Sequence, residues 1–173
     1  MFILNKKQHF SKVIIHAYNT SMTSVDKLCK TLSDYGAKPY IENNVDKFVI
    51  TMHLFNTNLV ARALLQKYSS KYADEISSVI ASMIYEICNR LDFDFEPISG
   101  AYLEIGDTLE DIVRNMGISS NTMLCRAVAI GSLRFAFNGE YNPEEQGYNR
   151  ITVEDALSRI FQGFFAEIQN YQP

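Results

Sequence analysis

Two stretches of the chain share one arrangement of hydrophobic and polar positions. KVIIHAYNT begins at Lys12 and KFVITMHLFNT begins at Lys47, and in each a run of β-branched and apolar residues precedes His-x-aromatic-Asn-Thr. Short runs of this kind that end in polar residues are typical of buried β-strands. The pattern therefore predicts strands over residues 12–18 and 47–55.

Between and beyond these runs, apolar residues recur with the spacing of an α-helix, and Gly36 stands where a helix would end. Asn and Asp at 43–46 predict a hairpin turn. The predicted elements are strands at 12–18, 39–42, 47–55 and 92–97, and helices at 25–35, 59–68 and 73–91. Their order, β-α-β-β-α-β, matches a ferredoxin-like arrangement in which the first and third strands are parallel neighbours.

The remainder of the chain has helical patterns. Residues 98–106 are rich in turn-forming residues and are expected to be a linker. Capping residues and apolar periodicity then predict helices at 107–117, 121–137 and 153–170. The sequence thus predicts an α+β protein, with a ferredoxin-like βαββαβ part over 1–97 and a helical part over 107–173 packed on it.

The charges are divided unevenly along the chain. Residues 1–72 carry ten Lys/Arg and four Asp/Glu, whereas residues 73–173 carry six Lys/Arg and sixteen Asp/Glu. The first segment therefore has a net charge of +6 and the second a net charge of -10. This division favours either a basic binding face with an acidic appendage or two segments that attract one another.

Composition indicates a folded intracellular protein. Hydrophobic residues make up 47% of the chain and charged residues 21%, which is typical of folded rather than disordered chains. The three cysteines lack metal-binding spacing and fit a reducing compartment. The most apolar stretch, 123–137, is too short to span a bilayer. We therefore expect a cytoplasmic protein that has no membrane segment, cofactor or bound metal.

The histidines of the two repeated stretches form the first candidate site. In the predicted sheet, His16 and His53 lie on one face near the carboxyl ends of adjacent parallel strands. This arrangement resembles the two-histidine phosphoesterases, and the resemblance implies acid–base catalysis by both imidazoles. That family has Thr or Ser two positions after each histidine, where this chain has Tyr18 and Phe55. Asn-Thr after a strand is also ordinary helix-capping chemistry, which gives the pair a purely structural explanation.

The aromatic residues of the same stretches form a second candidate site. Tyr18 and Phe55 would stand where RNA-recognition domains, which this part resembles, place rings that stack on bases. Lys12 and Lys47 add positive charge nearby, although the glycine-aromatic consensus of that domain is absent. These four residues, together with the histidines, are the candidate binding residues of the basic segment.

Residues 109–128, LEDIVRNMGISSNTMLCRAV, resemble the helix-turn-helix of bacterial regulators. Gly117 matches the turn glycine, and the resemblance implies that Ser120, Asn121 and Arg126 read DNA from the second helix. Arg126 also falls on a position that is apolar in that family. A helix that is apolar nearly all round is typical of a buried core, so a plain helical corner is the alternative.

Two further patterns have both structural and functional explanations. Asp92, Asp94 and Glu96 alternate on a predicted strand, an arrangement suited either to Mg²⁺ or to a solvated edge strand. The aromatic stripe at 161–165 fits either a core or a dimer seam. The edge strand and the core are the explanations we adopt.

The chain contains no Walker loop, GxGxxG, GxSxG or HExxH motif. We therefore expect a non-catalytic regulatory or inhibitory protein that acts as a homo-oligomer by binding another macromolecule, in the first place a protein. The first alternative is a nucleic-acid-binding regulator, which would use the basic sheet face or residues 109–128. The second alternative is a phosphoesterase that uses His16 and His53.

Overall fold

The computed structural model describes residues 2–68, 72–117 and 120–172, and their side chains from residue 9 onward. Within these ranges the regular structure is entirely helical and contains no β-strand. The prediction of an α+β, ferredoxin-like fold is therefore wrong, and the basic sheet face that the nucleic-acid hypothesis used does not exist in this structure.

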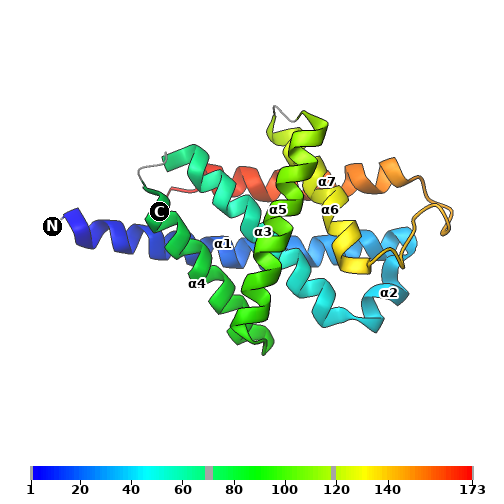
Figure 1. The fold of residues 1–173 in the computed structure, drawn as a ribbon, viewed down its shortest axis with the longest axis horizontal. Coiled ribbons are helices and arrows are strands. Elements are labelled where there is room, and N and C mark those ends of the chain that lie inside the picture. The colour runs from blue at the N-terminus through cyan, green and yellow to red at the C-terminus, as the bar shows by residue number, and fades with distance from the viewer. Residues whose placement is uncertain (1, 69–71, 118–119, 173) are drawn as a thin grey trace.

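The described residues form a bundle of long helices (Figure 1). A short kinked turn, η1 (Ser33–Ala37), in which Tyr35 and Gly36 have non-helical backbone angles, joins the first helix to the second. The helices are α1 (Phe2–Leu32), α2 (Lys38–Asn43), α3 (Val45–Tyr68), α4 (Ala73–Leu91), α5 (Phe95–Met116), α6 (Asn121–Phe137) and α7 (Arg150–Asn170).

Helix α3 lies at the centre of the bundle. It contacts α1, α4, α5, α6 and α7, and residues 50–60 are all buried. A helix enclosed in this way is buried on every face, so its sequence shows little helical periodicity. Its length and apolar composition would also suffice to cross a membrane, a test that core helices pass too, and 78% of its most apolar window is buried within the bundle.

The two predicted strands at 12–18 and 47–55 lie inside α1 and α3. A short apolar run has the same appearance in a buried strand and in a buried helix, and only the length of the element distinguishes them. In α1 the helical spacing is partly hidden, because the buried stripe includes the polar residues Thr20, Ser21 and Ser24 beside the apolar ones. The strand prediction for residues 12–18 therefore followed the run of β-branched residues and missed the helical period of α1.

The other two predicted strands and the predicted linker also lie wholly or partly in helices. The strand expected at 39–42 lies in α2, and the one at 92–97 covers the junction of α4 and α5. The expected linker at 98–106 lies within α5. A single hydrophobic cluster contains buried residues from both sides of that segment.

Gly36 lies in η1, just after α1, and breaks the helical path as predicted: it has a φ of 83°, which glycine adopts without strain. The chain turns there into α2. A Cβ on Gly36 would lie 3.2 Å from Gln146 Cβ and 3.3 Å from a ring carbon of Tyr148. The loop before α7 therefore packs closely on this turn, and the Tyr141 hydroxyl donates a hydrogen bond of 2.8 Å to the Tyr35 carbonyl oxygen.

Candidate binding groove

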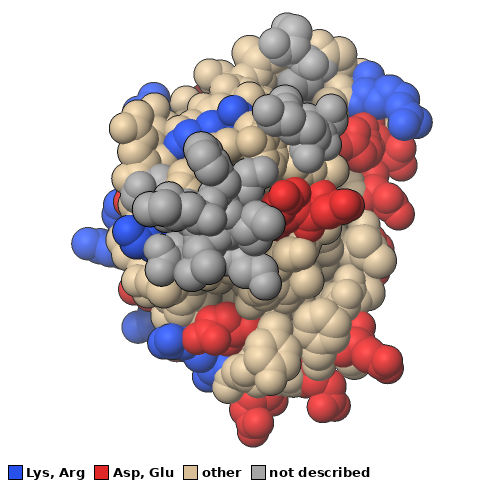
Figure 2. Space-filling view, turned by 90° about the vertical axis from the view of Figure 1, so that its left-hand side faces the viewer, with Lys and Arg blue, Asp and Glu red and all other residues tan. Residues whose placement is uncertain are grey.

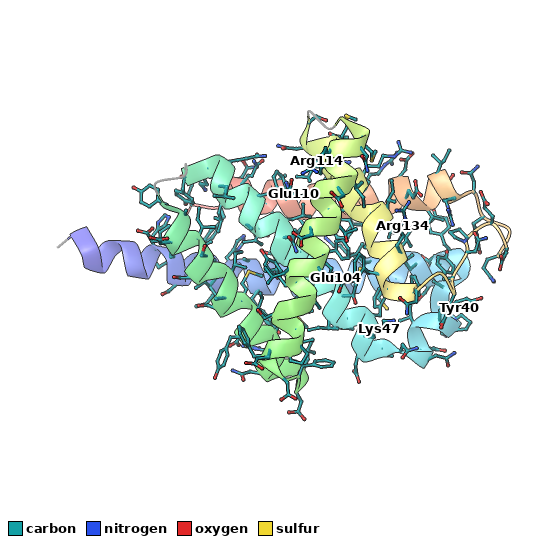
Figure 3. All side chains as sticks on the ribbon, viewed as in Figure 1. Tyr40, Lys47, Glu104, Glu110, Arg114 and Arg134 are labelled. Atoms are coloured by element: carbon teal, nitrogen blue, oxygen red, sulfur yellow. The ribbon has the colours of Figure 1, made fainter. Side chains whose placement is uncertain are left out.

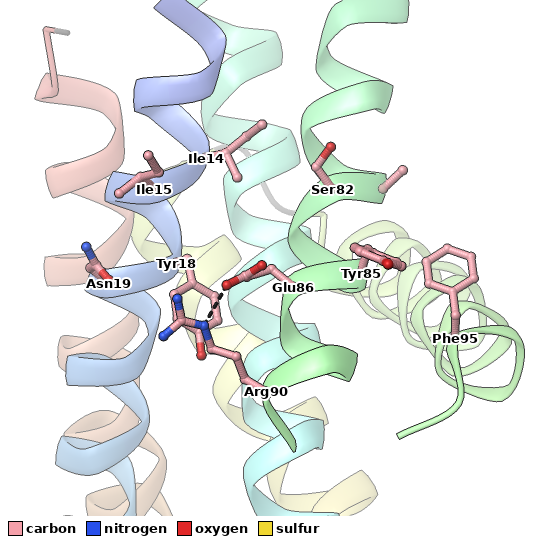
Figure 4. Close-up of a pocket in the computed structure, with 10 residues that line it drawn as sticks. Ile14, Ile15, Tyr18, Asn19, Ser82, Tyr85, Glu86, Arg90 and Phe95 are labelled. Carbon is pink, nitrogen blue, oxygen red and sulfur yellow. Dashed lines mark hydrogen bonds and ion pairs between the residues drawn. The ribbon is translucent and has the colours of Figure 1, made fainter. Parts of the chain in front are cut away.

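An apolar groove of about 690 Å³ runs between α1 and α4 (Figure 4). One wall is formed by Ile15 of α1, and the other by Tyr85 of α4 with Phe95 at the start of α5. These side chains are 63%, 58% and 40% exposed, respectively. Large apolar side chains that face water together mark an interaction surface more often than single exposed ones do.

Helical periodicity explains why these residues face outward. In α4 the stripe that sequence periodicity identified is buried against α1 and α3, and Tyr85 lies outside it. Ala81 and Ser82, the small exposed residues beside Tyr85, line the groove. The buried residues of α4 are Ile76, Val79, Ile80, Met83, Ile84, Ile87 and Cys88. Small side chains on the outer face of α4 thus leave room for an additional element.

A fixed polar group closes one end of the groove. The Arg90 guanidinium carbon lies 4.8 Å from the centre of the Tyr18 ring, a cation–π distance. Arg90 Nε donates a hydrogen bond of 2.6 Å to Glu86 Oε1, and this bond raises the pKa of Arg90. Tyr18 itself is buried, and burial raises the pKa of its hydroxyl. Arg90 is therefore held over the ring and does not extend freely into solvent.

The apolar surface continues across α4 into a second hollow of about 430 Å³ between α3, α4 and α5. Leu65 and Leu103 line this hollow and are 46% and 62% exposed. Ala81 and Phe95 line both hollows. Together they form one exposed apolar surface on both sides of α4, which we call the α4 surface.

The structure separates the two histidines that the sequence placed side by side. His53 lies in the middle of α3 with 1% of its surface exposed, and its Nδ1 is 2.8 Å from Ser21 Oγ. Burial lowers the pKa of His53 to about 4, so the imidazole is neutral at physiological pH. Ser21 and Asn56 beside it are fully buried, so this serine–histidine contact has no access to a substrate in this structure.

His16 lies on α1 and stacks on Tyr171, with ring centres 3.8 Å apart and planes 8° from parallel. Its Nε2 is 3.7 Å from Glu167 Oε1. His16 is thus part of the α1–α7 contact and does not share a pocket with His53.

The other candidate residues of the basic segment are dispersed. Phe55 is fully buried and packs edge-on against Phe135, so its ring is not available for stacking on a base. Lys12 and Lys47 are exposed, on α1 and at the start of α3, where Figure 3 labels Lys47. Of this set, Tyr18 alone lines the α1–α4 groove.

The helix-turn-helix-like segment contains the end of α5 and the start of α6, and residues 118–119 between them lie outside the described residues. Gly117 ends α5 with a φ of 60°, and the Ser120 hydroxyl accepts a hydrogen bond of 3.3 Å from Met123 N at the start of α6. Asn121 Oδ1 accepts from Gln66 Nε2 at 3.1 Å, and Arg126 Nη1 is 3.6 Å from Asp155 Oδ1. The candidate base-reading side chains Asn121 and Arg126 are thus engaged within the molecule, and most of α6 is buried.

Among the described residues, no three His, Cys, Asp or Glu side chains come together to hold a metal ion. Asp92, Asp94 and Glu96 flank the α4–α5 junction, with Asp92 ending α4 in a left-handed conformation. The aromatic stripe of α7, at residues 161–165, is buried in the core of this chain.

Comparison of the chain with family models, curated proteins and solved structures gave no match. Its class is therefore defined by its fold and its surface alone. Over the described residues it is an all-helical bundle with a central apolar helix and an exposed apolar surface around α4. Sequence reasoning missed Ile15, Tyr85 and Phe95, although the position of Tyr85 outside the apolar stripe of its helix was a usable signal.

Proposed function

We propose that the protein is a binding protein whose α4 surface receives an amphipathic helix of another protein. The observation that supports this most directly is the exposure of Ile15, Tyr85 and Phe95 around one groove. Burying such side chains is worth about 25 cal/mol for each Å² of apolar area removed from water. Amphipathic helices commonly dock into apolar grooves of this kind through side chains spaced three and four residues apart.

The outer face of α4 favours a helix as the ligand. Ser77, Ala81 and Ser82 are exposed and small, and large apolar residues stand on both sides of them. Because the distance between packed helices depends on the side chains at their contact, small residues here allow a close approach of about 8 Å. A partner helix lying along α4 would fill both hollows at once.

Charge defines the polar side of the partner. Residues 73–116, which form α4 and α5, contain ten Asp/Glu and two Arg, a net charge of -8. In the end-on view of Figure 2, Asp and Glu gather on the right and lower parts of the face, and most Lys and Arg lie on its left. A partner helix with Lys or Arg beside its apolar face would complement this rim, which favours fast and selective association.

The same charge disfavours a second copy of the chain as the occupant. In a symmetric dimer through the α4 surface, each subunit would present the same patch, so two segments of charge -8 would face one another. Formation of a homo-oligomer therefore stays a prediction that would involve other surfaces of the chain. Light scattering, which measures the mass of the particle in solution, tests it.

Two matched isoleucine substitutions test the proposal. Ile15→Asp places a charge in the groove, whereas Ile151→Asp changes an isoleucine of similar exposure, 57% against 63%, near the start of α7. A partner captured by affinity purification should bind the Ile15→Asp protein at least about tenfold more weakly, because docking would bury the new charge. The Ile151→Asp protein should bind as the wild type does.

Equal binding by the two variants would refute docking on the α4 surface. A bound partner segment without an amphipathic helix would refute the proposed occupant. Recovery of nucleic acid in place of protein, released steeply with salt, would instead support the nucleic-acid alternative.

A further inference from the structure

A second groove, of about 600 Å³, runs between α1 and α7 and has a different chemistry. Where the α4 surface is apolar, this groove is lined by hydroxyl, basic and acidic side chains. On α1 they are His16, Asn19, Thr20, Thr23, Ser24 and Lys27, and on α7 they include Arg159 and Glu167. The groove has no part in the function proposed above.

The pairing of the two helices separates the charges along the groove. α1 and α7 run in opposite directions (Figure 1), and the Thr20 hydroxyl donates a hydrogen bond of 3.3 Å to Glu167 Oε1. About two turns from that contact, forward along α1 and back along α7, stand Lys27 and Arg159. One end of the groove is therefore acidic and the other carries two cations.

The two cations at the basic end of the groove are available to bind an anion. Within the described part of the chain, neither Lys27 nor Arg159 has an ion-pair partner. Asp155, the carboxylate one turn before Arg159, is already 3.6 Å from Arg126. Ser24 lines the groove between the two ends with 4% of its surface exposed, and its buried Oγ has no hydrogen-bond partner among the residues that the structure describes. A buried hydroxyl without a partner is uncommon in folded proteins, so a ligand group or a water molecule that bonds to Ser24 would satisfy it.

We infer that the Lys27–Arg159 end of this groove binds the phosphate group of a small molecule. A guanidinium and an ammonium together match the charge of a phosphate dianion, and charge-assisted hydrogen bonds are the stronger kind. The Ser24 hydroxyl, whose Oγ is buried in this structure, would donate a further hydrogen bond after rotating toward the groove. The rest of the ligand would lie along α7 toward Glu167, whose carboxylate would repel a second anionic group.

Gly163 provides the space for such a ligand. It lines the groove on α7, and a Cβ added to it would meet nothing within 4 Å. A larger side chain at this position would enter the groove without displacing the helix. Gly163→Leu therefore fills the site while keeping both cations, and Gly163→Ala is its matched control.

The experiment is a titration of the ¹⁵N-labelled full chain with inorganic phosphate at constant ionic strength, followed by NMR. Saturable shifts should be confined to amides near 23–27 and 159–163. Lys27→Gln and Arg159→Gln should each weaken binding about tenfold, the typical loss of one charge-assisted hydrogen bond. Lys47→Gln, which removes an exposed cation outside the groove, should leave binding unchanged.

The remaining measurements distinguish a specific binding site from a general attraction of anions to positive charge. Gly163→Leu should abolish saturable binding and Gly163→Ala should retain it, with thermal unfolding showing that both are folded. Acetate, a monoanion, should bind more weakly than phosphate. No saturable shift in the wild type, or binding that survives in both the Lys27→Gln and Gly163→Leu proteins, would overturn the inference.

Discussion

At the scale of single residues, the most unusual feature is a polar cluster in the middle of the core. Asn56 Nδ2 donates a hydrogen bond of 3.0 Å to Ser21 Oγ, which in turn lies 2.8 Å from His53 Nδ1. One arrangement that satisfies these contacts has the Ser21 hydroxyl donating to His53 Nδ1 and accepting from Asn56, with the imidazole proton on Nε2. His53 Nε2 and Asn56 Oδ1 are buried and have no hydrogen-bond partner within the described ranges. Such a cluster costs stability if any member becomes charged.

Acid should therefore destabilise the protein through His53. Its pKa is about 4 in the folded chain and near 6.5 when unfolded, so unfolding takes up a proton between these values. The free energy of unfolding should fall as the pH drops from 6.5 to 4, by about 3 kcal/mol in total from this group. Urea unfolding at a series of pH values measures this slope.

The His53→Gln protein provides the comparison for that slope. It should be less stable at neutral pH, because it disturbs a buried polar cluster, and its stability should depend less on pH over the same range. Burial raises the pKa of Glu154, which acts in the opposite direction in both proteins, so the difference between them isolates His53. Identical slopes would show that His53 is not the titrating group.

At the scale of helices, two glycines show how surroundings decide the effect of one substitution. Gly163 in α7 has open space where a Cβ would point. Gly131 in α6 is buried, and a Cβ there would lie 3.1 Å from a ring carbon of Phe55. The intrinsic helix propensity of the two positions is the same, so tertiary contacts alone separate them.

Gly163→Ala should raise the free energy of unfolding by up to about 1 kcal/mol, the helix-propensity difference between alanine and glycine. Gly131→Ala should gain less or lose stability, because the fully buried Phe55 ring has little room to move. Chemical denaturation of both variants beside the wild type measures the difference. Equal stabilisation by the two substitutions would mean that α6 shifts freely relative to α3.

At the scale of the whole molecule, the central helix ties together segments that are distant in sequence. α3 packs against α6 and α7 as well as against α1 and α4, and α1 packs against α7. Leu59 and Val60 of α3 belong to the same hydrophobic cluster as Leu124 and Phe161. The basic segment 1–72 and the acidic segment 73–173 thus form helices that share one core.

A fragment of residues 1–97 should therefore not fold by itself. Removing the later helices would expose faces of α1 and α3 that α6 and α7 cover. We expect the fragment to unfold without a cooperative transition, whereas the full chain should show a single transition. Circular dichroism during heating distinguishes these outcomes, and a cooperative transition in the fragment would support the independent N-terminal part expected from sequence.

Much of the helical structure was predictable from local patterns. The extents of α4 and α6, and the glycines that follow the last turns of α1 and α5, were identified from spacing and capping chemistry, which act over a few residues. The candidate site was predicted only in part: Tyr18 was singled out, but as a base-stacking residue of a sheet. The exposed residues around α4 become a groove only when α1 and α5 pack beside it.

The sequence alone located α4, α6 and the C-terminal ends of α3, α5 and α7, and it determined the concentration of carboxylates in residues 73–116. Only the tertiary structure decided that 12–18 and 47–55 are helical. A β-branched run gains its stability from the neighbours that bury it, and those neighbours come from residues 121–170 as well as from nearby segments. The same packing decided which apolar side chains had no partner within the described chain, and so which surface is left to bind another molecule.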